Sequence, residues 1–193
     1  MTEQEKFMKS ALRLAKKAAA ENEVPIGAIV VCDGKIVGRG YNKRTKMQMA
    51  TKHAEILAIE QACRKFSSWR LPDCEIYITL EPCPMCLGAV LNARIRKVYF
   101  GASEKKGRSL TYEIANCDHL NHKVEIEGGL LAEECSAVLS DYFRSMRERE
   151  AKKKTQKSVE KTAEEKENAS EKAEESCENS EKVAEIRENS DES

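Results

Sequence analysis

Within the first 150 positions, several segments have apolar residues that recur in a helical pattern, with a repeat of about 3.6 residues. The sequence Thr2-Glu3-Gln4-Glu5 is typical of a capping box and predicts a helix that continues to about residue 20. Further helices are predicted from His53 to about residues 63–65, with Thr51 as the cap, and from Pro84 to about residue 92. A long amphipathic helix is predicted from Leu130 towards Arg149, and a short helical piece over residues 110–115.

Short apolar runs between these helices predict five strands, over residues 26–32, 35–41, 75–80, 97–101 and 123–126. Asp33-Gly34 is a strong turn signal and joins the first two strands as a hairpin. Strands that alternate with helices favour a sheet covered on both faces. The expected fold class is therefore α/β, a three-layer α/β/α arrangement with a mixed five-stranded sheet. Residues 42–49 and 103–108 are predicted to be polar loops.

The composition changes after residue 150. Residues 1–150 hold 24 basic and 20 acidic side chains, whereas residues 151–193 hold 9 and 13 and contain no aromatic residue, glycine or proline. A segment without an apolar face cannot offset the entropy lost on ordering. The sequence therefore predicts a mildly basic domain over residues 1–150 and a disordered, net acidic tail over residues 151–193.

Cysteine usage indicates a reducing compartment. The chain has eight cysteines, and all but Cys83 and Cys86 are scattered singly along it. The first residues after Met1 are charged, unlike a signal peptide, and no apolar run approaches the roughly 20 residues that span a bilayer. We therefore expect a cytoplasmic protein with reduced thiols.

The chemistry is concentrated in His53-Ala54-Glu55 and Pro82-Cys83-Pro84-Met85-Cys86, which together have the form H-x-E and P-C-x-x-C of zinc-dependent base deaminases. Cys83 and Cys86 are three residues apart and share one side of a helical turn. Two thiolates and one neutral imidazole, from His53, balance the charge of one zinc ion. Three protein ligands also leave the fourth position open, as in catalytic zinc sites. Zn2+, held by His53, Cys83 and Cys86, is the expected cofactor.

Glu55 is the candidate proton carrier. Two-residue spacing places Glu55 and His53 on different sides of a helix interior, so both can serve one site only at the beginning of a helix. There Glu55 can act as a general base and then as a general acid without ligating the metal. Taken alone, the cysteine pair could also be a redox pair or half of a structural zinc site. The absence of a second C-x-x-C pair and the presence of H-x-E favour the catalytic interpretation.

Residues 1–150 resemble the tRNA-specific adenosine deaminases, the TadA family within the cytidine deaminase-like fold. The similarity extends beyond the zinc motif. It includes Val24-Pro25-Ile26-Gly27-Ala28, Gly40-Tyr41-Asn42, Leu80-Glu81-Pro82-Cys83-Pro84-Met85-Cys86, Arg94-Ile95, Val98-Tyr99-Phe100-Gly101-Ala102, Asn121-His122 and Leu139-Ser140-Asp141-Tyr142-Phe143-Arg144. The loop after Gly101-Ala102 is shorter than is usual in the family, and the acidic tail has no family counterpart.

The resemblance implies hydrolytic conversion of adenosine to inosine at the wobble position of a tRNA anticodon, by a zinc-dependent enzyme that forms a homodimer. It implies that His53, Cys83 and Cys86 are the zinc ligands, Glu55 is the proton shuttle and Asn42 binds the substrate base. A tRNA anticodon stem-loop is then the expected partner.

Two other functions remain open on the sequence. One is deamination of a free base or nucleoside, such as cytosine, cytidine or guanine, by the same zinc chemistry. The other is a non-catalytic RNA-binding scaffold, which the presence of Glu55 argues against. Basic residues near the motif loops and on the last helix favour contact with RNA phosphates. They are Lys43, Arg44, Lys46, Lys105, Lys106, Arg108, Arg144, Arg147 and Arg149.

Overall fold

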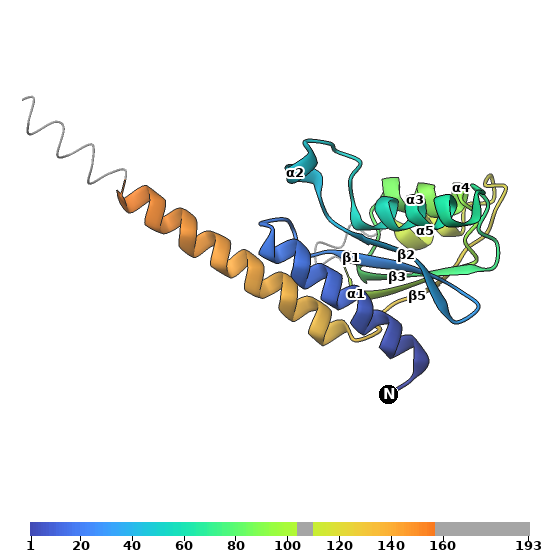
Figure 1. The fold of residues 1–193 in the computed structure, drawn as a ribbon, viewed down its shortest axis with the longest axis horizontal. Coiled ribbons are helices and arrows are strands. Elements are labelled where there is room, and N and C mark those ends of the chain that lie inside the picture. Colours follow the sequence, from blue (N-terminus) through green and yellow to red (C-terminus); the bar gives the residue numbers. More distant parts are fainter. Residues whose placement is uncertain (104–109, 157–193) are drawn as a thin grey trace, which may run out of the picture. The chain divides into compact units, whose positions relative to one another are not determined.

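The computed structural model describes residues 1–103 and 110–156, and its first compact unit is Met1–Arg144. A five-stranded sheet in the order β2-β1-β3-β4-β5 lies at the centre of this unit (Figure 1). Its strands are β1 (Gly27–Cys32), β2 (Lys35–Tyr41), β3 (Cys74–Leu80), β4 (Lys97–Ala102) and β5 (Glu125–Glu127). Strand β1 is antiparallel to β2 and β3, whereas β3, β4 and β5 run parallel. The predicted mixed five-stranded sheet is confirmed.

Helices cover both faces of the sheet. They are α1 (Glu3–Ala20), α2 (Arg44–Met47), α3 (Ala54–Phe66), α4 (Pro84–Asn92), α5 (Thr111–Ala115) and a further helix that begins at residue 132. Successive residues of β1 enter different cores: Val30 packs in the core that contains residues of α3 and α4, and Ile29 in the core that contains residues of α1 and Cys135. This alternation follows from the strand repeat of two residues and confirms the three layers.

Helix α3 lies unusually close to β2, because β2 carries two glycines where they meet. A Cβ atom on Gly40 would lie 2.0 Å from the carbonyl oxygen of Ala54, and one on Gly38 would lie 2.1 Å from that of Ala58. No side chain fits at either position. The first turn of α3, which carries Glu55, is thereby held against the sheet.

The structure confirms one local prediction and corrects two others. The capping box of Thr2 and Glu5 forms, with both hydrogen bonds present. The prediction that Thr51 caps the next helix is wrong, because the cap residue of α3 is His53. The predicted loop over residues 42–49 contains the short helix α2. The charged loop after Ser103 falls on residues 104–109, which lie outside the described residues.

The last helix continues further than its sequence pattern predicts. It runs from residue 132 to residue 156, the last residue that the structure describes, so that residues 145–156 of the second unit are helical. The remainder of the predicted tail, residues 157–193, lies outside the described residues. In the described part of the chain, no helix combines the length and apolar character needed to cross a membrane.

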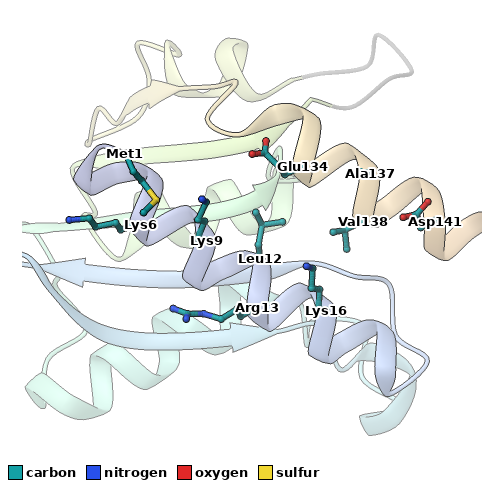
Figure 2. A pocket seen from close by; sticks show the side chains of 10 residues that line it. All are labelled: Met1, Lys6, Lys9, Leu12, Arg13, Lys16, Glu134, Ala137, Val138 and Asp141. Atoms are coloured by element: carbon teal, nitrogen blue, oxygen red, sulfur yellow. The ribbon is translucent and has the colours of Figure 1, made fainter.

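A groove of about 700 Å³ lies between α1 and the beginning of the last helix (Figure 2). Its lining comprises Met1, Lys6, Lys9, Leu12, Arg13, Lys16, Glu134, Ala137, Val138 and Asp141. It contains none of the predicted site residues, and α1 packs on the sheet face opposite to α3 and α4. The candidate chemistry therefore lies on the other side of the sheet from this groove.

Candidate active site

Two helix beginnings bring the three candidate metal ligands together. His53 is the cap residue of α3 and Cys83 that of α4, both with extended backbone, and Cys86 lies in the first turn of α4. The Nδ1 atom of His53 lies 3.8 Å from Sγ of Cys83 and 3.6 Å from Sγ of Cys86. The ligand atoms of the three residues all lie within 4.8 Å of one another, a cluster that could hold a metal ion.

The chain reaches this arrangement through β3. Strand β3 ends at Leu80, three residues before Cys83. Pro84 then occupies the first turn of α4, where its missing N–H is not needed. The buried hydroxyl of Thr111 donates a hydrogen bond of 3.1 Å to the carbonyl oxygen of Pro82. Helix α5 therefore supports the cysteine motif from a distant part of the sequence.

The neighbouring side chains shift the pKa values of the cluster in opposite directions. A hydrogen bond from the thiol of Cys86, together with His53, lowers the pKa of Cys83 to about 4. The hydrogen bond to Cys83, followed by burial, raises the pKa of Cys86. The hydrogen bond with Cys83 raises the pKa of His53. The three side chains thus interact closely, and a cation bound to them would favour loss of the thiol protons.

Glu55 lies beside this cluster with an unsatisfied oxygen. Its side chain is 3% exposed, and its Oε2 atom has no hydrogen-bond partner. Burial raises the pKa of this carboxyl, and the thiol of Cys86 lies within hydrogen-bonding reach of it. A buried polar atom without a partner is costly. Such an atom next to a metal-binding cluster fits a site that receives a further polar group.

The donor set fits a zinc ion. Two cysteines and one histidine are donors that zinc prefers, and a three-ligand set is characteristic of its catalytic sites. Glu55 supplies the additional carboxyl oxygen beside the three ligands. The residues present therefore match the requirements of a catalytic metal centre.

Asn42 is buried next to the same region. It follows β2 directly, is 4% exposed, and donates a 3.1 Å hydrogen bond from Nδ2 to Oε2 of Glu23. The next residue, Lys43, donates its backbone N–H to the carbonyl oxygen of Lys52 at 3.0 Å. Because Lys52 precedes His53, this bond brings the two chain segments that carry Asn42 and His53 side by side.

The predicted basic residues do not form one described group. Arg44 is exposed, and its charge is close enough to His53 to lower that residue's pKa against the dominant effect of Cys83. By contrast, Lys46 pairs with Glu21 at 2.9 Å, and Arg144 pairs with Asp141 at 2.6 Å. Lys105, Lys106 and Arg108 lie outside the described residues, and Arg147 and Arg149 belong to the second unit.

Two buried polar residues of the region are missed by the sequence interpretation. Glu23 is 1% exposed and bonds to Asn42, and Thr111 is 3% exposed and bonds to Pro82. Neither residue belongs to a motif. Glu23, which directly precedes Val24-Pro25, has the pattern of a polar residue at the end of a helix. Their positions depend on long-range contacts that no local pattern encodes.

A three-layer fold with a His-Cys-Cys cluster at two helix beginnings, and a buried glutamate beside it, is the arrangement expected of a base deaminase with a metal-binding site. Comparison with known proteins agrees with this class. The model of the MafB19-like deaminase family matches residues 2–147. A tRNA-specific adenosine deaminase of Bacillus subtilis (strain 168) is 43% identical over 161 residues, which are 82% of this chain and 99% of that protein. The chain belongs to the MafB19-like deaminases and, among them, to the tRNA-specific adenosine deaminase family.

Solved structures show the same relationship. A structure from a study of A-to-I editing by tRNA:A34 deaminases has a TM-score of 0.66 and 38% identity, and covers 69% of this chain and 98% of that one. A guanine deaminase from Nitrosomonas europaea has a TM-score of 0.61 and 25% identity, with 72% and 83% of the two chains covered. The similarity to the tRNA deaminase is thus greater in both sequence and structure.

Proposed function

We propose that this protein is a zinc-dependent deaminase that converts adenosine to inosine at the wobble position of a tRNA anticodon. The observation that carries the proposal is the cluster of His53, Cys83 and Cys86 beside the buried, partnerless oxygen of Glu55. Membership of the tRNA-specific adenosine deaminase family supports tRNA as the substrate.

His53, Cys83 and Cys86 would hold the zinc ion, which when bound supplies a water acidic enough to lose a proton near neutral pH. The residue that moves protons is Glu55, whose buried, partnerless oxygen can take up that proton. Glu55 returns this proton to the adenine ring nitrogen as the water oxygen bonds to C6. It then carries a second proton, from the new hydroxyl on C6, to the amine, which leaves as ammonia when its bond to C6 breaks. Burial favours this cycle, because a raised pKa lets one carboxyl both accept and return a proton.

Asn42 is the proposed contact to the substrate base. It is buried, it is fixed through Glu23, and its chain segment runs beside the segment that carries His53. Such an amide can bind the edge of a base that has left the anticodon stack, as deaminases of this type require.

The proposed catalytic domain spans residues 1–150. The match to the Bacillus relative covers 99% of that relative and 82% of this chain, which supports a domain of this size. A tRNA substrate and seven described cysteines without disulfides support a cytoplasmic location.

Arg44 is a proposed phosphate contact, because its charge is near enough to the site to affect His53. Replacing it with alanine is expected to raise KM for tRNA roughly tenfold at low salt and to leave kcat nearly unchanged. Phosphate contacts form equally in the ground and transition states, which explains this pattern. Steady-state kinetics at low and physiological salt measure the effect. The matched control Arg64→Ala removes an exposed arginine near the far end of α3 and should leave KM unchanged. Equal KM values for wild type and Arg44→Ala would contradict the assignment.

We also propose that the protein forms a homodimer through the outer face of α4. Met85 and Gly88 lie on this face three residues apart, with Met85 39% exposed, and a Cβ atom on Gly88 would meet no atom within 4 Å. An apolar face of this kind is typical of a protein interface.

Gly88→Glu is therefore expected to convert the dimer into monomers without unfolding the protomer. The monomer has room for the new side chain, whereas an interface would bury its charge. Light scattering coupled to gel filtration gives the mass, and circular dichroism checks the fold. The control Ser140→Glu places the same charge at an exposed position of the last helix. A dimer that survives Gly88→Glu would rule out this face.

The proposed function is tested by incubating zinc-loaded protein with total tRNA and, in parallel, with free adenosine, cytidine, cytosine and guanine. Inosine in tRNA hydrolysates, with little conversion of free compounds, is expected, because RNA contacts position the base. Efficient turnover of a free base without inosine in tRNA would instead support the free-base alternative.

A further inference from the structure

A second buried carboxylate, Glu23, lies behind the proposed base contact. Its side chain is 1% exposed, and both of its oxygens accept hydrogen bonds from N–H groups of one segment. Oε2 accepts from Nδ2 of Asn42 at 3.1 Å, and Oε1 accepts from the backbone N–H of Lys46 at 2.6 Å. Burying a carboxylate costs free energy unless such bonds compensate for lost water. The geometry therefore points to a defined role for this side chain.

The bond to Lys46 holds the segment that follows Asn42. Lys46 lies in α2, whose cap residue Lys43 makes no side-chain hydrogen bond to the helix. The first N–H groups of any helix lack partners within it. Glu23 supplies one of these partners from the connection between α1 and β1 and thereby fixes the segment just beyond Asn42.

The bond to Asn42 fixes the direction of its amide. The two ends of an asparagine amide are hard to distinguish by shape, but a carboxylate can only accept hydrogen bonds. The NH₂ group of Asn42 must therefore face Glu23, and its Oδ1 must face elsewhere. The amide is held ready to accept a hydrogen bond from a donor on the bound nucleoside.

We propose that Glu23 is a positioning residue that sets the donor and acceptor pattern which Asn42 presents to the target nucleoside. The proposal rests on the proposed function in one respect, since it takes Asn42 as the base contact. Glu23 touches no reacting atom. It acts by excluding the flipped amide, which would present a donor in place of the acceptor Oδ1.

Glu23→Gln tests this directly. A glutamine has one acceptor oxygen, whereas the site contains two N–H donors, from Asn42 and Lys46. If the oxygen stays with Lys46, the new NH₂ group faces the NH₂ group of Asn42 and forces that amide to flip. We expect kcat/KM to fall at least about tenfold, with zinc content retained. The control Glu21→Gln changes a nearby carboxylate that bonds to Tyr41 and the Lys46 side chain but not to Asn42, and should keep wild-type kcat/KM.

A double variant separates positioning from general destabilisation. In Glu23→Gln combined with Asn42→Asp, the new glutamine can donate to the new carboxylate and still accept from Lys46. The carboxylate then presents an acceptor to the nucleoside, as Asn42 does in the wild type. Asn42→Asp alone places two carboxylates in contact and is expected to be poorly active. We expect the double variant to exceed each single variant in kcat/KM by at least about fivefold.

The wild type and the four variants are assayed on tRNA and on free bases and nucleosides, and their melting temperatures are measured. If the wild type makes no inosine in tRNA, the proposed function fails, and the variants are compared on whichever compound reacts. Unchanged kcat/KM in Glu23→Gln would overturn the positioning role. So would a double variant no better than the single variants. Reduced activity that follows melting temperature alone would also overturn it.

Discussion

Glu55→Gln is expected to lower kcat on tRNA by about 10³-fold or more while leaving zinc content and RNA binding unchanged. Glutamine has nearly the same shape as glutamate, so the buried position that is 3% exposed remains filled. It cannot take up a proton at neutral pH, and the proposed cycle needs the same side chain to accept and return protons. The measurements are single-turnover kinetics, metal analysis and a binding assay with the anticodon stem-loop.

The control for this experiment is Glu60→Gln on the same helix. Glu60 is partly exposed and pairs with Lys52 at 2.9 Å and with Arg64 at 3.8 Å, so its neutralisation removes two ion pairs worth at most about 1 kcal/mol each. The Glu60→Gln enzyme is expected to deaminate tRNA at close to the wild-type rate. A Glu55→Gln enzyme of near wild-type kcat would show that another group carries the protons, and a Glu55→Gln enzyme without zinc would show a structural role instead.

Cys86→Ala is expected to reduce bound zinc from one ion per chain to almost none. Cys86 is fully buried, and its Sγ lies 3.6 Å from Nδ1 of His53, so its loss leaves two of the three clustered donors. Loss of a residue that merely supports a ligand lowers metal affinity about 10- to 100-fold, and loss of the ligand itself is expected to exceed that. Activity is expected to disappear with the metal.

The matched control is Cys63→Ala, which removes a thiol outside the cluster. It is expected to retain zinc and activity. The wild-type protein is also expected to melt at a lower temperature after treatment with a chelator, because binding to the folded state alone stabilises it. The melting temperature of Cys86→Ala is then expected to be insensitive to the chelator. Full zinc occupancy in Cys86→Ala would exclude Cys86 as a ligand.

The sequence predicts the elements that a local pattern specifies. The capping box at Thr2, the turn at Asp33-Gly34 and the apolar runs of the strands each depend on neighbouring residues, and the structure places the corresponding elements within a few positions. The H-x-E and P-C-x-x-C motifs predict a shared site at two helix beginnings, and the structure brings His53, Cys83 and Cys86 together there.

The features that the sequence interpretation misses depend on distant partners. The backbone N–H of Lys46 in α2 donates a hydrogen bond to Glu23, more than twenty residues away, and a loop prediction based on residues 42–49 contains no sign of this bond. His53, and not Thr51, is the cap residue of α3, and the carbonyl oxygen of Ala54 in the first turn of α3 lies against Gly40 of β2, a contact that no local pattern encodes. Thr111 reaches Pro82 only because α5 folds back onto the cysteine motif.

The most direct test of the central claim is mass spectrometry of nuclease fragments from an anticodon stem-loop that carries adenosine at the wobble position. The account predicts that zinc-loaded wild-type protein converts that adenosine to inosine, and that a second adenosine placed in the paired stem stays unchanged, because a base must leave the stack to react. Glu55→Gln, with zinc bound, is expected to leave both unchanged. A wobble adenosine that the zinc-loaded protein does not convert, under conditions in which it deaminates free guanine or cytidine, would contradict the account.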